Sequence, residues 1–283
     1  MMGLFKGRSR DARGELQDLL GDYDVPNVSS TAINVLSLLR DPDAPMSEVA
    51  RRVETDPGLT VRILRLTNSA AFGLMSQVSN LQHAIALLGR SRLESLVLTF
   101  AAADRLPDRM ECMEARLFWA TAARRATLAR MFAQHMHAAT QAEAFTAGLL
   151  QDIAVPLLAG NNPEGYSAVL ERWHADQSLR LDVLERELFG FDHAKVGALM
   201  AEDWGLPKYL VQAIGGHHEQ GKTSHADPAV RLVSLLNYSP ENDGTESLKD
   251  AAKAEFEIDA ALIEEMVDRS VASAEEFAGM FLN

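Results

Sequence analysis

The sequence contains a single cysteine, Cys112, among 283 residues. One thiol cannot form an internal disulfide or a multi-cysteine zinc site, so nothing in the chain requires an oxidising compartment. No stretch approaches the roughly 18 uninterrupted apolar residues typical of a membrane span, and the N-terminus lacks the apolar core of a secretory signal. These absences predict a soluble, cytoplasmic protein.

Positive charge is in the minority. The chain carries 27 Lys and Arg against 40 Asp and Glu, a formal net charge of −13 at pH 7. Such a field repels phosphate backbones, which disfavours non-specific nucleic-acid binding. One short part of the chain is nevertheless rich in arginine, at Arg51, Arg52, Arg62, Arg65, Arg90 and Arg92. Exposed faces of amphipathic helices account for these residues without a nucleic-acid site.

Common catalytic motifs are missing as well. The chain has no glycine-rich phosphate loop, no nucleophile elbow and no cysteine–histidine pair, so the nucleotide-binding and acyl-transfer classes lose support. The alternation of apolar and polar residues that marks half-buried strands is scarce. Nearly every apolar run has helical spacing instead, which predicts an all-α fold.

Two helix starts are predicted by capping boxes. Ser79 and Gln82 precede one apolar run, Gly89 follows it, and Ser91 with Glu94 begins the next. Two helices joined by a tight glycine turn have the outline of a DNA-binding helix-turn-helix. With the net negative charge of this chain, we favour plain helical packing over DNA reading.

Changes in composition divide the chain into segments. We expect a partly flexible leader over 1–24, an N-terminal helical lobe over 25–106, a helical bundle over 107–238 and a C-terminal helical extension over 246–283. The extension is acidic and amphipathic. It either packs on the body or presents a partner-binding face, and we favour packing.

The residues that could carry chemistry are a carboxylate and several histidines: Asp152, His193 and the adjacent pair His217 and His218. Metal-assisted phosphoester hydrolysis needs imidazoles and carboxylates that converge on one or two ions, because the ion must activate water and neutralise phosphate charge. A paired histidine can equally be a helix cap, a surface patch or a core residue. Both interpretations stay open at this point.

The order of several short motifs resembles the HDOD family, the HD-related output domains. In the first half these motifs are DPGLTVRILRLTNSA at 56–70 and AIALLG at 84–89, and in the second half AGLLQDI at 147–153, WGLP at 204–207 and the His217-His218 pair. Glu185, His193 and Gly197 fall in the family's order too. The similarity covers roughly residues 25–237.

This resemblance implies a degenerate relative of the HD phosphohydrolases, with a helical N-terminal lobe joined to an HD-like helical bundle. The enzymes of that superfamily use a histidine, a histidine-aspartate pair and a later aspartate. Here the pair reads Gln151-Asp152, the first histidine's helix reads WATAA at 119–123, and Asn237 replaces the last aspartate. An amide offers neither an imidazole nitrogen nor a charge to a metal ion.

The resemblance therefore implies a non-catalytic module, with no catalytic residue and no cofactor expected. Its role would be signal-transduction output or regulatory protein interaction in bacteria, with partners in cyclic-dinucleotide or two-component pathways. The sequence does not indicate the oligomeric state.

Two alternatives remain. The first is a divergent metal-dependent phosphohydrolase or cyclic-dinucleotide phosphodiesterase that uses a single divalent metal. It is suggested by four residues that match extra ligand positions of the HD-GYP phosphodiesterase branch: Asp152, His193, His217 and His218. The second is a pocket that senses a small molecule without catalysis.

The alignment also makes a structural prediction. Trp119 and Trp204 should be buried near the site, and Gln151 should face Asn237 instead of solvent.

Overall fold

The computed structural model describes residues 9–21, 30–68, 77–104, 112–176, 179–219, 226–238 and 243–279, and all regular structure in these ranges is helical. The predicted all-α class is therefore confirmed. The helices are α1 (Ser9–Leu20), α2 (Ser30–Arg40), α3 (Met46–Val53), α4 (Pro57–Thr67), α5 (Leu81–Ala103), α6 (Ala115–Met136), η1 (Ala138–Thr140), α7 (Gln141–Leu150), α8 (Val155–Asn161), α9 (Pro163–Ala175), α10 (Leu181–Phe189), α11 (His193–Asp203), α12 (Lys208–Gly216), α13 (Pro228–Val233), α14 (Thr245–Phe256) and α15 (Ala260–Ala278).

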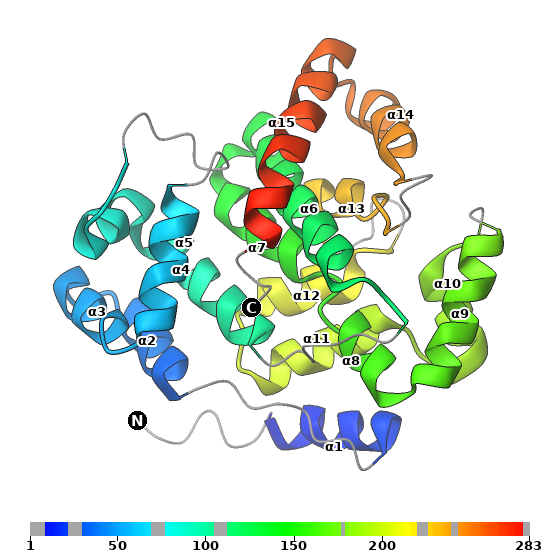
Figure 1. The fold of residues 1–283 in the computed structure, drawn as a ribbon, viewed down its shortest axis with the longest axis horizontal. Helices are drawn as coiled ribbons and strands as arrows, with labels where there is room; N and C mark the ends of the chain where they lie inside the picture. Colours follow the sequence, from blue (N-terminus) through cyan, green and yellow to red (C-terminus); the bar gives the residue numbers. More distant parts are fainter. Residues whose placement is uncertain are drawn as a thin grey trace.

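Helices α2 to α5 form an N-terminal lobe on one side of the molecule (Figure 1). The start of α4 is fixed by the side chain of Asp56, which accepts the N–H of Leu59 at 3.0 Å, and by Pro57 in the first helical position. Within α5, Gly89 has φ 71° and ψ 175°. The predicted break at this glycine is thus a kink between two helical halves, both of which bury apolar side chains in the core.

The centre of the bundle is the pair of helices α6 and α7, which pack closely along their length. Their approach depends on Gly148 of α7, where an added Cβ would lie 3.0 Å from the Cβ of Ala129 and 3.0 Å from the backbone oxygen of Arg125. A larger residue would push the helices apart. The four-residue turn that follows α7, residues 151–154, is consequently held beside α6.

Helices α11 and α12 also pack closely against each other. Gly197 faces this contact, because a Cβ added there would lie 2.9 Å from Cγ2 of Ile214. The spacing of the two helices sets the positions of the histidines singled out in the sequence, because α11 begins at His193 and α12 ends directly before His217.

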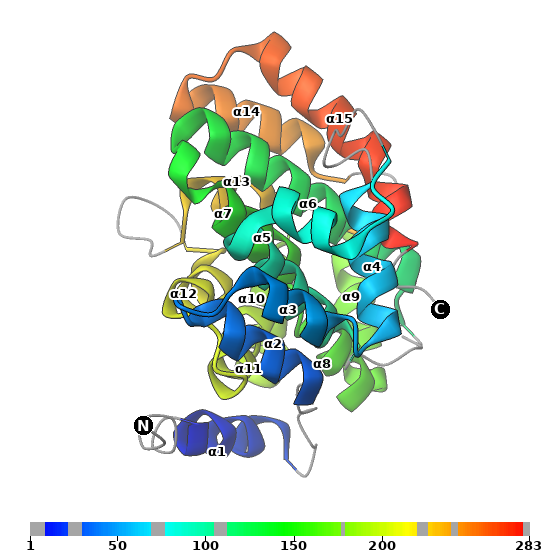
Figure 2. The same ribbon diagram turned by 90° about the vertical axis from the view of Figure 1, so that its left-hand side faces the viewer.

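Helices α1 and α14 lie at opposite ends of the molecule (Figure 2). Part of the expected leader is α1, which packs on α11 and buries Ala12, Leu16 and Leu20. At the other end α15 packs along α6. Helix α14, which precedes α15 in the chain, buries only Leu248 and Ala252. It is therefore held by a narrow apolar stripe.

Helix α13 is short and ends at Val233. The chain then turns: the N–H of Leu235 donates to the carbonyl of Leu232, and the N–H of Leu236 donates to that of Val233. This turn carries the carbonyl of Leu236 toward α6 and leaves Asn237 outside any helix.

One stretch, Ala138–Asn161, is long and apolar enough by composition to cross a membrane, with a mean hydropathy of 1.2. In the fold it consists of η1, α7, a turn and α8, and 89% of its most apolar window is buried inside the protein. Core packing accounts for its apolar composition. The cytoplasmic location stays a prediction.

Candidate functional site

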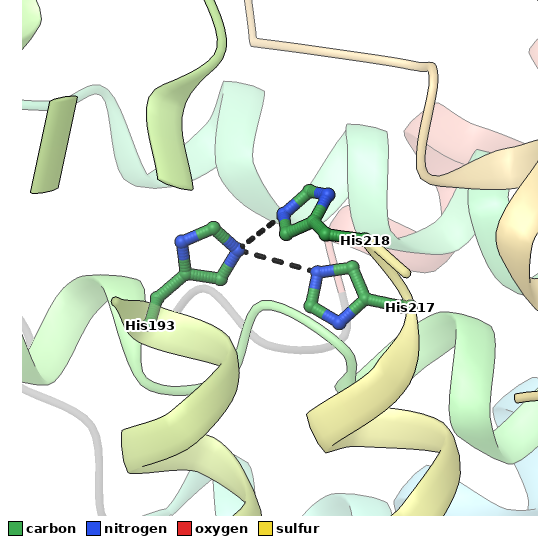
Figure 3. A group of neighbouring side chains, drawn as sticks. All are labelled: His193, His217 and His218. Atoms are coloured by element: carbon green, nitrogen blue, oxygen red, sulfur yellow. Dashed lines mark hydrogen bonds between the residues drawn. The ribbon is translucent and has the colours of Figure 1, made fainter. Parts of the chain in front are cut away.

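Three imidazoles meet at the ends of α11 and α12 (Figure 3). His193 is the first residue of α11, whose start is capped by Asp192 through the N–H of Lys195 at 2.8 Å. His217 and His218 directly follow the last residue of α12. The Nε2 atom of His193 is 3.3 Å from Nε2 of His217 and 2.9 Å from Nε2 of His218. The structure therefore brings together the three histidines singled out in the sequence.

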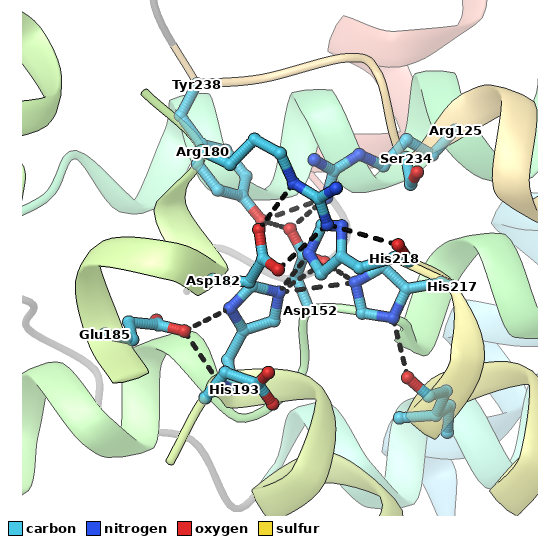
Figure 4. Close-up of polar contacts among 12 residues, drawn as sticks. Arg125, Asp152, Arg180, Asp182, Glu185, His193, His217, His218, Ser234 and Tyr238 are labelled. Carbon is cyan, nitrogen blue, oxygen red and sulfur yellow. Dashed lines mark hydrogen bonds and ion pairs between the residues drawn. The ribbon is translucent and has the colours of Figure 1, made fainter. Parts of the chain in front are cut away.

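Hydrogen bonds on the far side of two rings fix their orientation (Figure 4). Nδ1 of His193 donates to Oε2 of Glu185 at 2.6 Å, and Nδ1 of His217 donates to the carbonyl of Ile214 at 2.6 Å. A carboxylate and a carbonyl only accept, so each Nδ1 carries a proton and each Nε2 points into the cluster. This is the arrangement by which histidines are usually oriented toward a metal ion.

Glu185 is itself held in place. Its Oε2 also accepts the backbone N–H of His193 at 2.8 Å, and its Oε1 accepts the hydroxyl of Tyr166 at 2.6 Å. Glu185 and Tyr166 are fully buried. The two residues come from α10 and α9, so three successive helices fix the orientation of one imidazole.

Asp152 lies in the turn after α7 and joins the cluster through one of its two carboxylate oxygens. Oδ1 is 3.2 Å from Nε2 of His217 and 3.5 Å from Nε2 of His193, and it is buried without a hydrogen-bond partner among the described residues. Oδ2 faces the other way and pairs with the guanidinium of Arg125 and the hydroxyl of Tyr238. All four candidate ligands from the sequence thus converge on one place.

The side chain of Arg125, from α6, was not predicted to belong to the site. It is 3% exposed, and its guanidinium pairs with Asp152, donates to the hydroxyl of Tyr238 at 3.0 Å and donates to the carbonyl of Leu236. The guanidinium carbon lies 5.0 Å from the centre of the Tyr238 ring. A permanent positive charge is therefore built into the wall of the site.

The charges of the site shift the protonation of its members. Burial alone would raise the pKa of Asp152, but the charge of Arg125 and the two nearby imidazoles hold it well below the usual value. Burial would lower the pKa of His193, but Glu185 and Asp152 outweigh it and raise that pKa well above the usual value. Burial, together with the neighbouring imidazoles, lowers the pKa of His218. These surroundings therefore favour the protonated form of His193.

The resemblance implies that Gln151 and Asn237 stand at positions where the enzymes have metal ligands. Gln151 is fully buried, as predicted, but its side-chain amide makes no hydrogen bond to Asn237 or to any other described residue. The backbone N–H of Asn237 donates to Asp243. Trp119 is buried, which confirms one expectation, whereas Trp204 is only partly buried.

A cavity of about 610 Å³ opens above the cluster. Its floor includes His193, His217 and His218, and Arg180 and Trp173 line its side. Arg180 is fixed by two hydrogen bonds to Asp182, at 2.9 and 2.8 Å, and by one to the carbonyl of His218 at 3.1 Å. The cavity is large enough for a small molecule. Helix α14 closes its far side.

This all-helical fold, with its histidine cluster between α11 and α12, agrees with the resemblance noted in the sequence. The model of the HDOD domain matches residues 25–220, and the chain belongs to the HDOD family. Helices α13, α14 and α15 lie beyond the matched residues.

The chain is also similar to individual proteins. An uncharacterized protein of Treponema pallidum (strain Nichols) is 25% identical over 219 residues, which are 76% of this chain and 42% of that protein. Two crystal structures share the fold. One is a candidate phosphohydrolase of Shewanella amazonensis SB2B, with a TM-score of 0.74, 22% identity and coverage of 95% of this chain and 98% of that one. The other is a candidate signal transduction protein of Marinobacter aquaeolei VT8, with a TM-score of 0.72, 21% identity and coverage of 97% and 66%.

The donors of the cluster fit a single transition-metal ion of the zinc type. Three Nε2 atoms lie within 4.8 Å of one another, and the buried Oδ1 of Asp152 beside them has no hydrogen-bond partner among the described residues. Three imidazoles and a carboxylate form a donor set that suits such an ion. An ion there would displace the proton of His193, because a metal ligand needs the free nitrogen lone pair.

Proposed function

We propose that this HDOD domain is a non-catalytic signalling module that binds one divalent metal ion at His193, His217, His218 and Asp152. The observation that carries the proposal is the pairing of Asp152, whose Oδ2 is taken by Arg125 and Tyr238. A carboxylate bound in this way cannot bridge two ions. Hydrolysis assisted by two metals requires such shared positions.

The number of donors supports a regulatory or structural role for a single ion. Structural zinc sites fill all four positions with protein ligands, whereas catalytic sites keep one position open for water. Here three imidazole nitrogens form the cluster. Oδ1 of Asp152, 3.2 Å from Nε2 of His217, would supply a fourth donor. Gln151, the neighbour that replaces a histidine of the enzymes, makes no contact that would add or exchange a donor.

The proposed partners are signalling proteins of cyclic-dinucleotide or two-component pathways, in the bacterial cytoplasm. Membership of the HDOD family supports this role. The name of the Marinobacter protein, a candidate signal transduction protein, agrees with it. The chain spans 42% of its Treponema relative and 66% of the Marinobacter chain, so the activities of those whole proteins are not transferred to it.

A divergent metal-dependent phosphohydrolase is the second candidate. It is favoured by the cavity of about 610 Å³ that leads directly to the histidines. Arg180 at the side of the cavity could contact an anionic substrate. For turnover, however, one of the four donors would have to leave the ion to make room for water.

Metal analysis and activity assays on the same purified protein separate the two functions. We expect about one equivalent of zinc, manganese, iron or nickel, lost in His193→Ala, and no hydrolysis of phosphomonoesters or cyclic dinucleotides. Arg172→Ala is the matched control, because its ion pair with Glu187 lies on the exposed surface. Turnover that disappears in Asp152→Ala would overturn the non-catalytic function. Absence of metal from the wild type after zinc loading would overturn the metal site.

A further inference from the structure

Two adjacent arginines of α6, Arg124 and Arg125, hold the two described ends of the connection between α13 and α14. We name these ends, residues 236–238 and 243–245, the α14 tether. Arg125 holds the first end at the site, and Arg124 holds the second end at the start of α14. The site and the last helices are therefore linked by neighbouring residues of one helix.

The first end of the α14 tether is bound directly to the site. Arg125 donates to the carbonyl of Leu236 and to the hydroxyl of Tyr238, and the same hydroxyl donates to Oδ2 of Asp152. Arg125, Asp152, Leu236 and Tyr238 are all buried. A change in the pairing of Asp152 must therefore change the contacts that hold this end.

The second end includes the first residue of α14 and is bound by Arg124. Arg124 donates to Oδ2 of Asp243 at 2.6 Å and to the hydroxyl of Thr245 at 2.9 Å, and Oδ1 of Asp243 accepts the N–H of Thr245 at 3.0 Å. The two ends also touch, because the N–H of Asn237 donates to the carbonyl of Asp243 at 2.9 Å. Gly244, in the second end, can approach the first end this closely only because it lacks a Cβ, which would overlap the carbonyl oxygen of Leu235.

Helix α14 is the element that this arrangement can move. It forms one wall of the cavity above the histidines, through Ser247, Ala251 and Phe256. Leu248 and Ala252 are its only buried residues, and Ala251 and Phe256 pack on the core while partly exposed. Apart from the tether, α14 is therefore held by a narrow apolar stripe. Segments with little buried apolar surface open at low free-energy cost.

We propose that a metal ion at the histidine cluster weakens the hold of Arg125 on the α14 tether, so that metal binding is read out as a loosening of α14. This inference rests on the single-metal site proposed above. Its physical basis is that a doubly charged ion beside Oδ1 of Asp152 would carry more positive charge than the imidazoles alone, opposite the guanidinium on Oδ2. In a buried site the two positive charges repel each other, and the carboxylate charge is divided between them.

Hydrogen exchange of the full-length protein, with and without Zn²⁺ alone, tests the direction of this coupling. We expect Zn²⁺ to speed exchange at 236–238 and in the first two turns of α14, and to leave α2 to α5 unchanged. Calorimetry on the same samples reports binding. Zinc that binds while exchange of α14 stays the same or slows would overturn the coupling alone. No binding would overturn the metal site and the coupling together.

Linkage supplies a second test away from the metal donors. If metal binding loosens the tether, a loosened tether must strengthen metal binding by the same factor. We expect Asp243→Asn, which weakens the pair with Arg124, to tighten Zn²⁺ binding about fivefold or more. Thr245→Val should act in the same direction. Equal affinity in wild type and in both variants, measured by calorimetry on folded protein, would overturn the proposal.

The matched control is Arg62→Met. It removes an arginine–aspartate pair of the same kind, with Asp104, from the N-terminal lobe. Its Zn²⁺ affinity should equal that of the wild type. A similar gain of affinity in this control would show a general effect of lost ion pairs and would overturn the specific role of the tether.

Discussion

The N-terminal lobe and the helical bundle each contain a partly or fully buried arginine, and the two are used differently. Arg90 of the lobe caps the C-terminal end of α2. Its guanidinium donates to four backbone carbonyls in and just after the last turn, those of Leu38, Leu39, Asp41 and Ala44. All four acceptors are neutral. The hydrogen bonds of Arg90 are thus satisfied within the lobe itself.

Arg125 of the bundle pairs with a charged group instead of neutral carbonyls alone. It pairs with Asp152, whose other oxygen has no hydrogen-bond partner among the described residues, and its own Nε is also buried without one. Buried polar groups without partners cost free energy and are concentrated where a protein binds something. The comparison teaches that the lobe is built for stability and that the bundle retains a charge arrangement suited to a ligand.

The largest effect should come from Arg125→Met. This change leaves Asp152 as an uncompensated buried charge, which should lower the free energy of unfolding by about 3–5 kcal/mol. Urea denaturation measures it. The double variant Arg125→Met, Asp152→Asn should recover much of the loss because both charges are then gone. No recovery in the double variant would show that lost packing, and not charge, causes the effect.

Zinc should stabilise the bundle and act through the cluster. At a free concentration of one hundred times its dissociation constant, one bound ion raises the free energy of unfolding by about 2.7 kcal/mol. A thermal-unfolding series should show this rise in the wild type and lose it in His218→Ala. His174→Ala is the control, because that imidazole contacts Trp173 outside the cluster. Full stabilisation of His218→Ala would contradict the four-donor site.

Arg90→Met should lower the free energy of unfolding by about 2 kcal/mol, because hydrogen bonds from a charged donor are lost at the end of α2. The affinity for Zn²⁺ should not change, in contrast to variants of the α14 tether. Chemical denaturation and calorimetry measure the two quantities. An altered affinity would show that the lobe and the site are coupled. It would contradict the view that Arg90 serves only the stability of the lobe.

The smallest effect concerns Asp182. Burial would raise the pKa of its carboxyl group, but hydrogen bonds from Arg180 and Arg186 hold that pKa below the usual value. A folded-state pKa below the unfolded one contributes stability above the unfolded pKa of about 3.9, and the contribution disappears as pH falls through the folded pKa. Asp182→Asn should therefore cost about 1 kcal/mol at pH 7 and progressively less below about pH 4. A difference that is independent of pH would contradict this account.

Much of the fold and half of the site could be predicted from the sequence. Helical periodicity specified the all-α class, and the order of motifs indicated Asp152, His193, His217 and His218, which the structure brings together. Periodicity works because it reports which face of a helix is buried. Whether the cluster binds a metal stays a prediction.

The other half of the site depends on contacts between distant segments, which no local pattern records. Arg125 reaches Tyr238 across 113 positions of the chain. One signal was available: Arg125 stands among alanines in the sequence TAARRATLAR at 121–130, on a helix otherwise rich in buried small residues. Tyr238 had no such signal, because it lies outside any helix, five residues after α13 ends at Val233.

The contact of Gly197 with Ile214 implies that spacing can be lost while every ligand is kept. An alanine at 197 would place its methyl group 2.9 Å from Cγ2 of Ile214 and press α11 away from α12. The imidazoles of His193 and His217 would then separate, although neither residue had changed. We therefore expect a homologue that carries all four candidate donors but a bulkier residue at this position to bind the proposed ion weakly.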